Sequence, residues 1–517
     1  MIFKSPWAET EIPEVSLSGF VLEGAADRGD KPALIDGPTG RTITYAELGF
    51  AVERVAAGLR GRGFKQGDVF AIFSPNIPEY AVAFHGVVRA GGTVTPINPL
   101  YTVEEISFQL TDSNARFLVT IPQFLDRATE AAKKVGIEEI FVFGEAEGAT
   151  PFASLLAGEG AAPELDTDVY NDLVVLPYSS GTTGLPKGVM LSHHNLVSNI
   201  SQSLSASTTD ENDRVIGVLP FFHIYGLTII LNMALKSGAT VVTMPRFDLE
   251  EFLTLMQDHK ITRAYLVPPI ILALAKHPIV DKYDLSSLDV IMSGAAPLDA
   301  DLSASAGGRL DTVVMQGYGL TETSPVTHMN PDEKGKDRPG SIGFLIPNTT
   351  AKIVHTETGE ELGTDERGEV WIKGPQVMKG YLQNEEATAF TIDDDGWLHT
   401  GDIGYVDSDG YFFLVDRLKE LIKYKGFQVP PAELEAVLIS HPAVADAAVI
   451  GVPDEEAGEL PKAYVVLSED IDTDEIIRYV AEKVSPQKKV RLIEVIDEIP
   501  KSAAGKILRR VLKDREQ

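Results

Sequence analysis

The chain of 517 residues contains no cysteine. This absence excludes disulfides, thiolate metal sites and a cysteine nucleophile, so any thioester chemistry has to use a thiol that a substrate brings. Long apolar runs are also missing, because no stretch reaches the roughly 18 residues of a membrane-spanning helix. The start "MIFKSPWAETEIPEV" carries acidic residues where a signal peptide has its apolar segment. We therefore expect a cytoplasmic protein that does not insert into membranes.

Basic residues are scarce, with 45 Lys and Arg against 76 Asp and Glu and a formal net charge of −31. Nucleic acids and anionic membranes attract proteins with a basic face, so this charge disfavours both as partners. The 10 histidines show neither the H-x-x-x-H nor the H-E-x-x-H spacing, and structural zinc is not expected. The sequence carries no indication of the oligomeric state.

Hydrophobic patterns predict alternating helices and strands in the first part of the chain. Residues 44–63 have a helical period, residues 68–75 are typical of a buried strand, and residues 78–92 are typical of a helix that ends in glycine. A Gly/Ala/Glu/Pro-rich segment at 144–166 is interpreted as a surface connection between subdomains. A second block of helices and strands is expected from about 173 to 330. This alternation predicts parallel or mixed sheets covered by helices.

The pattern changes twice in the rest of the chain. Residues 340–416 become strand-rich and glycine-punctuated, as a small β-barrel-like subdomain would be. After Arg417, helical and strand-like stretches alternate over about 100 residues, enough for a separate α+β domain. The predicted fold is therefore α/β, with a large N-terminal domain (1–416) of two α/β subdomains plus the small β subdomain, and a small α+β C-terminal domain (417–517).

The stretch "YSSGTTGLPKGVMLSH" at 178–193 combines glycines and hydroxyl residues with a single lysine. Glycine lets the backbone approach a ligand, and hydroxyl and N–H groups donate to oxyanions, so the stretch predicts a phosphate-binding loop. A Walker-type loop is excluded, because Pro186 stands where its second glycine belongs and Lys187 is followed by Gly188 instead of a hydroxyl residue. The apolar runs on both sides predict a strand–loop–strand arrangement. A flexible linker is disfavoured, since Pro186 restricts the chain beside Lys187.

Six further clusters contain small, aromatic or basic residues typical of a nucleotide site. They are "PFFHIYG" (220–226), "SGAAPL" (293–298), "QGYGLTET" (316–323), "DGWLHTGDIG" (395–404), "VDRLKELIKYKGFQV" (415–429) and "PKSAAGKILRR" (500–510). Each cluster alone has a purely structural explanation. His223 by itself is more often a core histidine, and "KILRR" by itself is typical of a solvated basic helix end.

Together and in this order, the clusters resemble the adenylate-forming superfamily of acyl-CoA synthetases, 4-coumarate–CoA ligases, luciferases and amino-acid adenylation domains. The resemblance extends from about residue 30 to 510 and is strongest to the 4-coumarate–CoA ligase branch. It implies a two-step reaction with ATP, Mg²⁺ and CoA. A small-molecule carboxylic acid attacks the α-phosphate of ATP to give an acyl-adenylate and pyrophosphate, and the CoA thiolate then displaces AMP.

The resemblance also implies roles for individual residues of the nucleotide site. The residues expected to contact ATP or AMP are Ser179, Ser180, Gly181, Thr182, Thr183 and Lys187 at the β- and γ-phosphates, Thr321 at the α-phosphate, Gly294, Ala295, Ala296, Gln316, Gly317 and Tyr318 at the adenine and adenylate, and Asp402 with Arg417 at the ribose. A carboxylate suits the ribose because it accepts two hydrogen bonds. Glu322, with Thr183, is expected to support Mg²⁺.

The same resemblance implies a mobile C-terminal domain that turns about a hinge at Lys419. In one orientation Lys506 serves adenylation, and in the other Lys423 and Gln428 approach the adenylate while Lys425, Gly426 and Arg263 contact CoA. Such alternation lets one pocket serve two transition states. His223 is expected to act at the gate of the acyl pocket. The other pocket residues expected are Tyr225, Thr228, Met292, Gly317, Gly319, Pro325 and Val326.

Flat slots between glycines and aromatic rings suit an aryl-propenoate or a medium-length acyl chain. Compared with plant coumarate ligases, Thr228, Met292 and Thr327 replace Asn, Lys and Leu. Met292 has no donor for a ring hydroxyl, so selectivity for 4-hydroxy acids stays open. "SPQKKV" at 485–490 also lacks a tyrosine common in relatives.

Three alternatives to a 4-coumarate–CoA ligase stay open. A fatty-acyl-CoA or luciferase-like synthetase would use the same motifs, although the C-terminal "KDREQ" is not a peroxisomal S-K-L address. An amino-acid adenylation domain would usually carry an Asp in "FFHIYG" to pair with the substrate ammonium. A catalytically silent nucleotide-binding protein would be expected to have lost charged site residues, whereas Lys187, Glu322, Asp402, Arg417 and Lys506 are all present.

Overall fold

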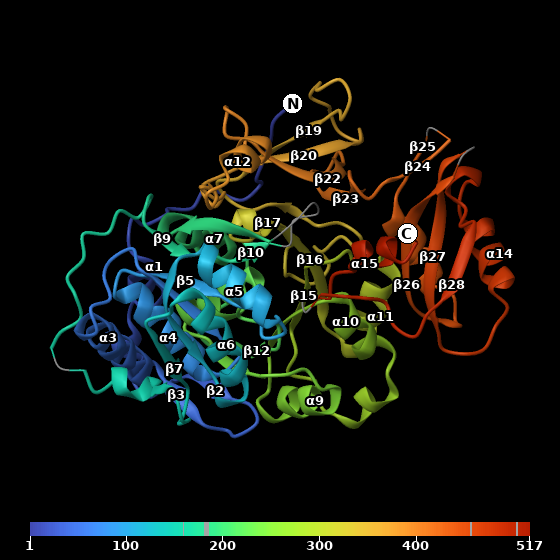
Figure 1. Ribbon diagram of the computed structural model, residues 1–517. Coiled ribbons are helices and arrows are strands. Elements are labelled where there is room, and N and C mark those ends of the chain that lie inside the picture. Colours follow the sequence, from blue (N-terminus) through green and yellow to red (C-terminus); the bar gives the residue numbers. More distant parts are fainter. Residues whose placement is uncertain (159, 180–185, 426, 455–456, 503–504, 517) are drawn as a thin grey trace.

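The computed structural model describes residues 1–158, 160–179, 186–425, 427–454, 457–502 and 505–516. Figure 1 shows the N-terminal elements as a layered body of sheets and helices, with the C-terminal elements from β24 onward gathered at one side. Within the described part of the chain, no helix is both long and apolar enough to span a bilayer. The predicted α/β class, with a large N-terminal and a small C-terminal part, is confirmed.

The first sheet has the strand order β10-β11-β9-β5-β4-β6-β7-β8. Its strands are β4 (Val69–Phe73), β5 (Thr93–Pro96), β6 (Ala115–Thr120), β7 (Glu139–Val142), β8 (Thr150–Pro151), β9 (Leu173–Val175), β10 (Tyr178–Ser179) and β11 (Lys187–Ser192). The helices of this region are α3 (Tyr45–Gly61), α4 (Pro78–Arg89), α5 (Val103–Asp112) and α6 (Leu125–Val135). Every residue of β4 is buried, which explains its unbroken apolar run. A capping box between Thr44 and Glu47 starts α3.

The second sheet has the order β18-β17-β16-β15-β14-β12-β13-β2-β3. Its strands are β2 (Pro32–Asp36), β3 (Thr42–Thr44), β12 (Arg214–Gly217), β13 (Thr240–Thr243), β14 (Arg263–Leu266), β15 (Val290–Ser293), β16 (Val313–Gly319), β17 (Val326–Met329) and β18 (Phe344–Leu345). Its helices are α7 (His193–Ser205), α8 (Ala234–Ser237), α9 (Leu249–Asp258), α10 (Pro268–Lys276) and α11 (Ala300–Leu310), with a π-helix η3 (Gly226–Met233) and the short helices α1 (Leu17–Val21) and α2 (Ala25–Arg28) nearby.

The two blocks exchange strands, because β2 pairs in parallel with β13 of the second sheet, while β9 pairs with β5 of the first. One expectation about these blocks is wrong. The segment 144–166 is more than a surface connection, since β8 extends the first sheet beside β7. Phe152 and Leu155, in the short helix η2 (Phe152–Leu155), are buried in the core. Leu155 comes so close to Gly58 that a Cβ on this glycine would lie 2.3 Å from the Leu155 carbonyl oxygen.

A third sheet, with the order β1-β19-β20-β22-β23, lies in the region where the small β-barrel-like subdomain was predicted. Its strands are β1 (Phe3–Lys4), β19 (Thr350–Val354), β20 (Gly368–Lys373), β22 (Leu398–Val406) and β23 (Phe412–Arg417), with β21 (Gly380–Tyr381) and α12 (Glu385–Thr391) between β20 and β22 in the chain. β21 pairs with β11 and so connects this region to the first sheet.

The C-terminal sheet has the order β25-β24-β27-β26, with β28 beside β27. Its elements are β24 (Ile422–Tyr424), β25 (Phe427–Val429), α13 (Pro431–Ile439), β26 (Val444–Asp454), β27 (Gly458–Leu467), α14 (Thr473–Lys483), β28 (Leu492–Val495) and α15 (Arg509–Asp514). Two hydrophobic clusters within residues 422–512 share no member with the clusters of the earlier sheets. The division at residues 416 and 417 stays a prediction that these separate cores support.

Candidate active site

The carboxyl ends of β15 and β16 form the centre of the candidate site. These strands are parallel neighbours, with Ser293 opposite Gln316. The turn that follows β15 is held by the Gln316 side chain, whose Oε1 accepts the Leu298 N–H at 2.8 Å. Ala295 in this turn has φ +67°, a conformation that non-glycine residues adopt mostly at special sites. The predicted nucleotide residues Gly294 to Ala296 and Gln316 therefore lie at one edge of the sheet.

The predicted acyl-pocket residues pack against one another beside this edge. The Tyr225 hydroxyl donates to the Met292 carbonyl at 3.2 Å, and a Cβ on Gly294 would lie 2.8 Å from the Tyr225 ring. A Cβ on Gly317 would lie 2.1 Å from the Met292 methyl group. A side chain at Gly294 would collide with the Tyr225 ring, whereas a side chain at Gly317 would force the flexible end of Met292 to move. The two glycines thus make room for the side chains of Tyr225 and Met292.

The other predicted pocket residues lie around the same place. A Cβ on Gly319 would lie 2.0 Å from the Pro325 carbonyl oxygen, so glycine is required there. Val326 is buried at the start of β17. Thr228 is fully buried in η3, and its Oγ1 has no hydrogen-bond partner among the described residues. Short π-helical stretches are frequent at functional sites, and the sequence pattern did not predict this one.

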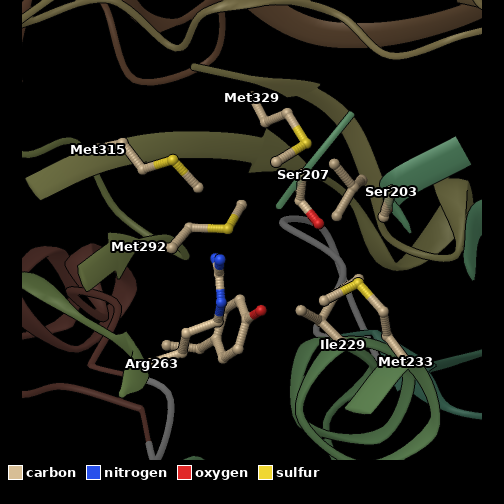
Figure 2. Close-up of a pocket in the computed structure, with 10 residues that line it drawn as sticks. Ser203, Ser207, Ile229, Met233, Arg263, Met292, Met315 and Met329 are labelled. Carbon is tan, nitrogen blue, oxygen red and sulfur yellow. The ribbon is translucent and has the colours of Figure 1, made fainter. Parts of the chain in front are cut away.

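A cavity beyond Met292 is lined mostly by sulfur-containing and aliphatic side chains. Figure 2 shows Met292, Met315 and Met329 converging from neighbouring strands, with Met233 and Ile229 facing them from the helix. All four methionines are almost fully buried. Methionine is unbranched and polarizable, so such a wall adapts to ligands of different shape. Since Met292 borders both Gly317 and this cavity, it separates the predicted acyl slot from deeper space.

Arg263 also lines this cavity, and its surroundings do not support the predicted contact with CoA. Its Nε lies 2.7 Å from Asp213 Oδ2, its Nη1 lies 2.9 Å from Asp332 Oδ2, and its Nη2 donates to the Thr208 hydroxyl at 2.5 Å. The Arg263 side chain is only 8% exposed. In Figure 2 it points toward Met292. A buried cation with two carboxylate partners is held by the protein itself, which favours a structural role for Arg263.

The described part of the phosphate loop meets the candidate magnesium ligand. β10 and β11 pair with Ser179 opposite Lys187, as the predicted strand–loop–strand arrangement requires. The Glu322 carboxylate accepts the Ser179 hydroxyl at 3.2 Å and the Tyr381 hydroxyl at 2.8 Å on the same oxygen, Oε1. The Lys187 ammonium lies 4.9 Å from the centre of the Tyr381 ring. Four of the predicted phosphate ligands, Ser180, Gly181, Thr182 and Thr183, lie outside the described residues.

Tyr381 was not predicted as a site residue. It comes from β21, which pairs with β11, and its ring and hydroxyl contact the lysine and the carboxylate on two sides. Only the pairing of distant strands reveals this contact. Thr321 begins the short helix η5 (Thr321–Thr323) and, together with Tyr178 and His223, lines a second cavity to which α5 contributes Gln109.

The predicted ribose carboxylate is buried between two partners. Asp402 in β22 lies opposite Arg417 in β23, and its Oδ1 lies 3.3 Å from the arginine Nε. Its Oδ2 accepts the Tyr318 hydroxyl at 2.5 Å. Burial raises the pKa of Asp402, while Arg417 and the Tyr318 hydrogen bond oppose this rise. The structure thus brings together Tyr318, Asp402 and Arg417, which the sequence assigned to the nucleotide site.

Lys506 lies close to this cluster although it belongs to the C-terminal region. Burial, followed by the charge of Arg417, lowers the pKa of Lys506 to about 8, while Glu420 and Asp402 oppose this shift. The pKa of His223 is lowered to about 4, first by burial and then by the charge of Lys506. Gly505 packs near the start of α10, where an added Cβ would lie 3.5 Å from Val267 Cγ2. The structure therefore brings Lys506, His223 and Asp402 into one electrostatic environment.

The residues predicted for the second half-reaction lie elsewhere. Lys423 and Gln428 are opposite each other in the hairpin of β24 and β25, and the Lys423 side chain is exposed. Figure 1 shows this hairpin apart from α15, which follows Lys506. Lys425 follows β24 with φ +48°, and Gly426 lies outside the described residues. Lys419 is exposed in the turn that follows β23. The proposed roles of these residues in a second orientation stay predictions.

The fold and this cluster define an adenylate-forming enzyme. The family model "AMP-binding enzyme" matches residues 21–382, and the model "AMP-binding enzyme C-terminal domain" matches residues 433–506. The chain therefore belongs to the AMP-binding enzyme family, and the predicted superfamily is confirmed.

The chain is similar over its full length to several curated relatives. It is 46% identical to 4-coumarate–CoA ligase 5 of Oryza sativa subsp. japonica over 524 residues, which cover 99% of this chain and 97% of the relative. It is 43% identical to 4-coumarate–CoA ligase 1 of Petroselinum crispum over 527 residues, which cover 100% of this chain and 97% of the relative.

Solved structures with the same architecture include two ligand complexes. The anthranilate CoA ligase AuaEII in complex with anthranoyl-AMP aligns with a TM-score of 0.90 and 29% identity over 98% of each chain. ATP-bound MatB from Rhodopseudomonas palustris aligns with a TM-score of 0.87 and 31% identity, over 97% of this chain and 99% of that one.

Proposed function

We propose that the protein is an ATP-dependent carboxylate–CoA ligase that forms an acyl-adenylate and then an acyl-CoA thioester, with hydroxycinnamates such as 4-coumarate as its acids. The position of Lys506 carries this proposal. A lysine from the C-terminal region, partly desolvated and close to Arg417 and Asp402, is suited to a reaction at the α-phosphate beside the ribose. The names of the full-length relatives support CoA as acceptor and 4-coumarate as acid.

In the first half-reaction, a carboxylate oxygen of the acid attacks the α-phosphorus of ATP. A new bond forms between this oxygen and phosphorus, and the bond to the bridging oxygen of pyrophosphate breaks. The Lys506 ammonium would neutralise the carboxylate and phosphate oxygens that approach each other. Asp402 would accept the ribose hydroxyls, and Lys187 would hold the departing pyrophosphate.

Glu322 fits the proposed magnesium site. Mg²⁺ usually binds through one or two carboxylates together with substrate phosphates and water, and one well-held carboxylate meets this need. Ser179 and Tyr381 fix the Glu322 carboxylate through its Oε1 atom. No group of three or more acidic or histidine side chains suited to a metal occurs among the described residues. When bound, the ion would neutralise charge on the phosphates.

In the second half-reaction, the CoA thiolate attacks the acyl carbonyl and AMP leaves with the oxygen that came from the acid. Lys423 and Gln428 are proposed to reach the adenylate after the C-terminal domain turns at Lys419. The exposed position of Lys423 on the β24–β25 hairpin supports this, since the side chain is available to a new partner.

The methionine-lined cavity favours medium-chain fatty acids as a second candidate class. The cavity holds about one water molecule, so a chain longer than a phenylpropenoate fits beyond Met292 only when the flexible side chains of Met233, Met315 and Met329 move aside (Figure 2). Each buried methylene contributes roughly 0.8 kcal/mol to binding.

One screen tests the function and ranks the acids. AMP and thioester are measured with ATP, Mg²⁺ and CoA across 4-coumarate, cinnamate, ferulate, benzoate and C6 to C12 fatty acids. We expect equal amounts of AMP and thioester, with the highest kcat/KM for a hydroxycinnamate. Hydrolysis of ATP without a thioester from any acid would contradict the proposal.

A further inference from the structure

Arg509 lies three residues after Lys506 and is enclosed by acidic side chains. Its Nη2 donates to both carboxylate oxygens of Glu435, at 2.8 and 2.7 Å, and its Nη1 donates to Glu420. Its Nε donates to the Val449 carbonyl at 3.2 Å. The Arg509 side chain is 12% exposed, against 9% for Glu435 and 15% for Glu420. A guanidinium with this many partners has a defined position.

These partners surround the turn that contains the predicted hinge. Glu420 follows Lys419 directly, and its backbone N–H donates to the Arg417 carbonyl at 2.9 Å. Asp416, at the end of β23, accepts the Ala432 N–H at the start of α13 at 2.8 Å. Burial raises the pKa of Asp416, and the charge of Arg509 opposes this rise. Arg509 therefore lies between the hinge turn and α13.

The segment that carries Lys506 is short and is tied at both ends. The Ser502 N–H donates to the Lys506 carbonyl at 2.8 Å, and the Leu508 N–H donates to the Pro500 carbonyl at 2.8 Å. Arg509 begins α15 immediately after this segment. The position of the Arg509 guanidinium thus fixes the point from which the Lys506 side chain reaches the active site.

Glu420 lies near both cations. It raises the pKa of Lys506 and accepts a hydrogen bond from Arg509. A carboxylate beside a catalytic ammonium competes with substrate oxyanions for that ammonium. Because Arg509 binds the Glu420 carboxylate, this competition is weakened.

We propose that Arg509 is a positioning residue for Lys506. Its bonds to Glu420 and Glu435 hold the Lys506 segment against the hinge turn in the orientation that serves adenylation, and they keep Glu420 from neutralising the lysine. This inference rests on the proposed function, because it assigns Arg509 to the first half-reaction only. A purely structural role would make both half-reactions depend on Arg509 equally.

The first test separates the half-reactions. Arg509→Met removes the guanidinium, Arg509→Lys keeps the charge, and Arg510→Met is the matched control, since Arg510 is adjacent and its side chain is 76% exposed. Pyrophosphate release reports the first step, and thioester formation from supplied acyl-adenylate reports the second. We expect Arg509→Met to slow the first step on the order of 10²-fold, as misplacement of a catalytic group does. The second step should change less than about 3-fold.

Arg509→Lys should recover part of the first step, and Arg510→Met should match the wild type. Parallel loss of both steps in Arg509→Met, or equal loss in Arg510→Met, would overturn the inference. A wild-type enzyme that performs neither step with any acid would instead contradict the proposed function.

A second test uses the pH dependence of the first step and applies even where Arg509→Met folds poorly. The charged and titratable groups that face Lys506 are Arg417, Glu420, Asp402, Arg509 and His223. Arg509 lowers the pKa of Lys506 and Glu420 raises it. The alkaline limb of pyrophosphate release should therefore move to higher pH in Arg509→Met, which loses the positive charge, stay near the wild-type position in Arg509→Lys, which keeps it, and move to lower pH in Glu420→Gln. A limb that stays unchanged in Glu420→Gln, or one that moves the same way in Glu420→Gln and Arg509→Met, would overturn the inference.

Discussion

Asp402 and Arg417 face each other across the β22–β23 ladder, with Asp402 Oδ1 3.3 Å from Arg417 Nε. Asp402 is buried and Arg417 is partly exposed, and Arg417 is the last residue of β23 before the hinge turn. Asp402→Asn keeps the shape of the side chain and removes its charge. We expect kcat/KM for ATP to fall roughly 10- to 100-fold, because hydrogen bonds to a charged acceptor contribute roughly 1.5–3 kcal/mol. ATP–pyrophosphate exchange measures this, with exposed Asp394→Asn as the control.

Lys506→Ala should separate the two half-reactions more strongly than any other single change in the site. Adenylation should slow on the order of 10² to 10³-fold, because a preorganised charge at the α-phosphate is lost. Thioester formation from supplied acyl-adenylate should be nearly unchanged. Rapid-quench measurements of pyrophosphate and thioester follow the two steps, and an equal loss in both would contradict the role assigned to Lys506.

Adenylation should also decline above about pH 8, since the pKa of Lys506 is lowered to about 8 and the ammonium form is required. The rate of pyrophosphate release, measured between pH 6 and 10 with saturating substrates, should show one ionisation on the alkaline side. A rate that stays constant to pH 10 would show that the protonated lysine is not needed.

Glu322→Gln should raise the Mg²⁺ concentration required for half-maximal adenylation, because a neutral amide binds a hard cation less well. Tyr381→Phe keeps the ring beside Lys187 and removes one hydrogen bond to Glu322. This variant should lose about 5-fold in rate, the effect of one hydrogen bond of about 1 kcal/mol. Exposed Glu385→Gln serves as the control, and an unchanged Mg²⁺ dependence in Glu322→Gln would argue against its role.

Met292→Ala should join the acyl slot to the deeper cavity. We expect kcat/KM for decanoate relative to cinnamate to rise by about 10-fold, since one or two buried methylenes are worth about 1–3 kcal/mol in specificity. Met256→Ala is the control for general destabilisation, because Met256 is buried in α9 and does not line the cavity. Equal changes for both acids would show that Met292 does not separate the two spaces.

Buried neutral histidines should limit stability in mild acid. Burial lowers the pKa of both His85 and His328 from 6.5 to about 3. Below about pH 6.5 the unfolded chain binds protons that the folded chain does not, so stability falls as the pH decreases toward 3. Each histidine contributes at most about 1.4 kcal/mol per pH unit. The free energy of unfolding, measured with urea between pH 7.5 and 5, should depend less on pH in His328→Gln than in wild type. The exposed control His277→Asn should show the wild-type dependence on pH.

Much of the site could be predicted from the sequence because its motifs keep their chemistry in short stretches. Asp402, Arg417 and Tyr318 were assigned to one nucleotide site, and the structure brings them into direct contact. Helices such as α3 could be predicted because a period and a capping box both belong to one segment.

The rest depends on pairing between distant strands. The β2–β13 pair and the contact between Tyr381 and Glu322 join segments that carry no local signal for each other. The ion pairs of Arg263 with Asp213 and Asp332 also join distant segments. The sequence assigned Arg263 to CoA from the resemblance alone, and that contact stays a prediction.

Transfer of a labelled oxygen tests the proposed acyl-adenylate most directly. The enzyme is incubated with ATP, Mg²⁺, CoA and 4-coumarate that carries ¹⁸O at both carboxylate oxygens, and AMP and thioester are analysed by mass spectrometry. The proposed reaction predicts one ¹⁸O atom in each AMP formed and one equivalent of 4-coumaroyl-CoA, because the attacking oxygen leaves with the α-phosphate. AMP without ¹⁸O, or AMP formed without a thioester, would contradict an acyl-adenylate on the path to CoA.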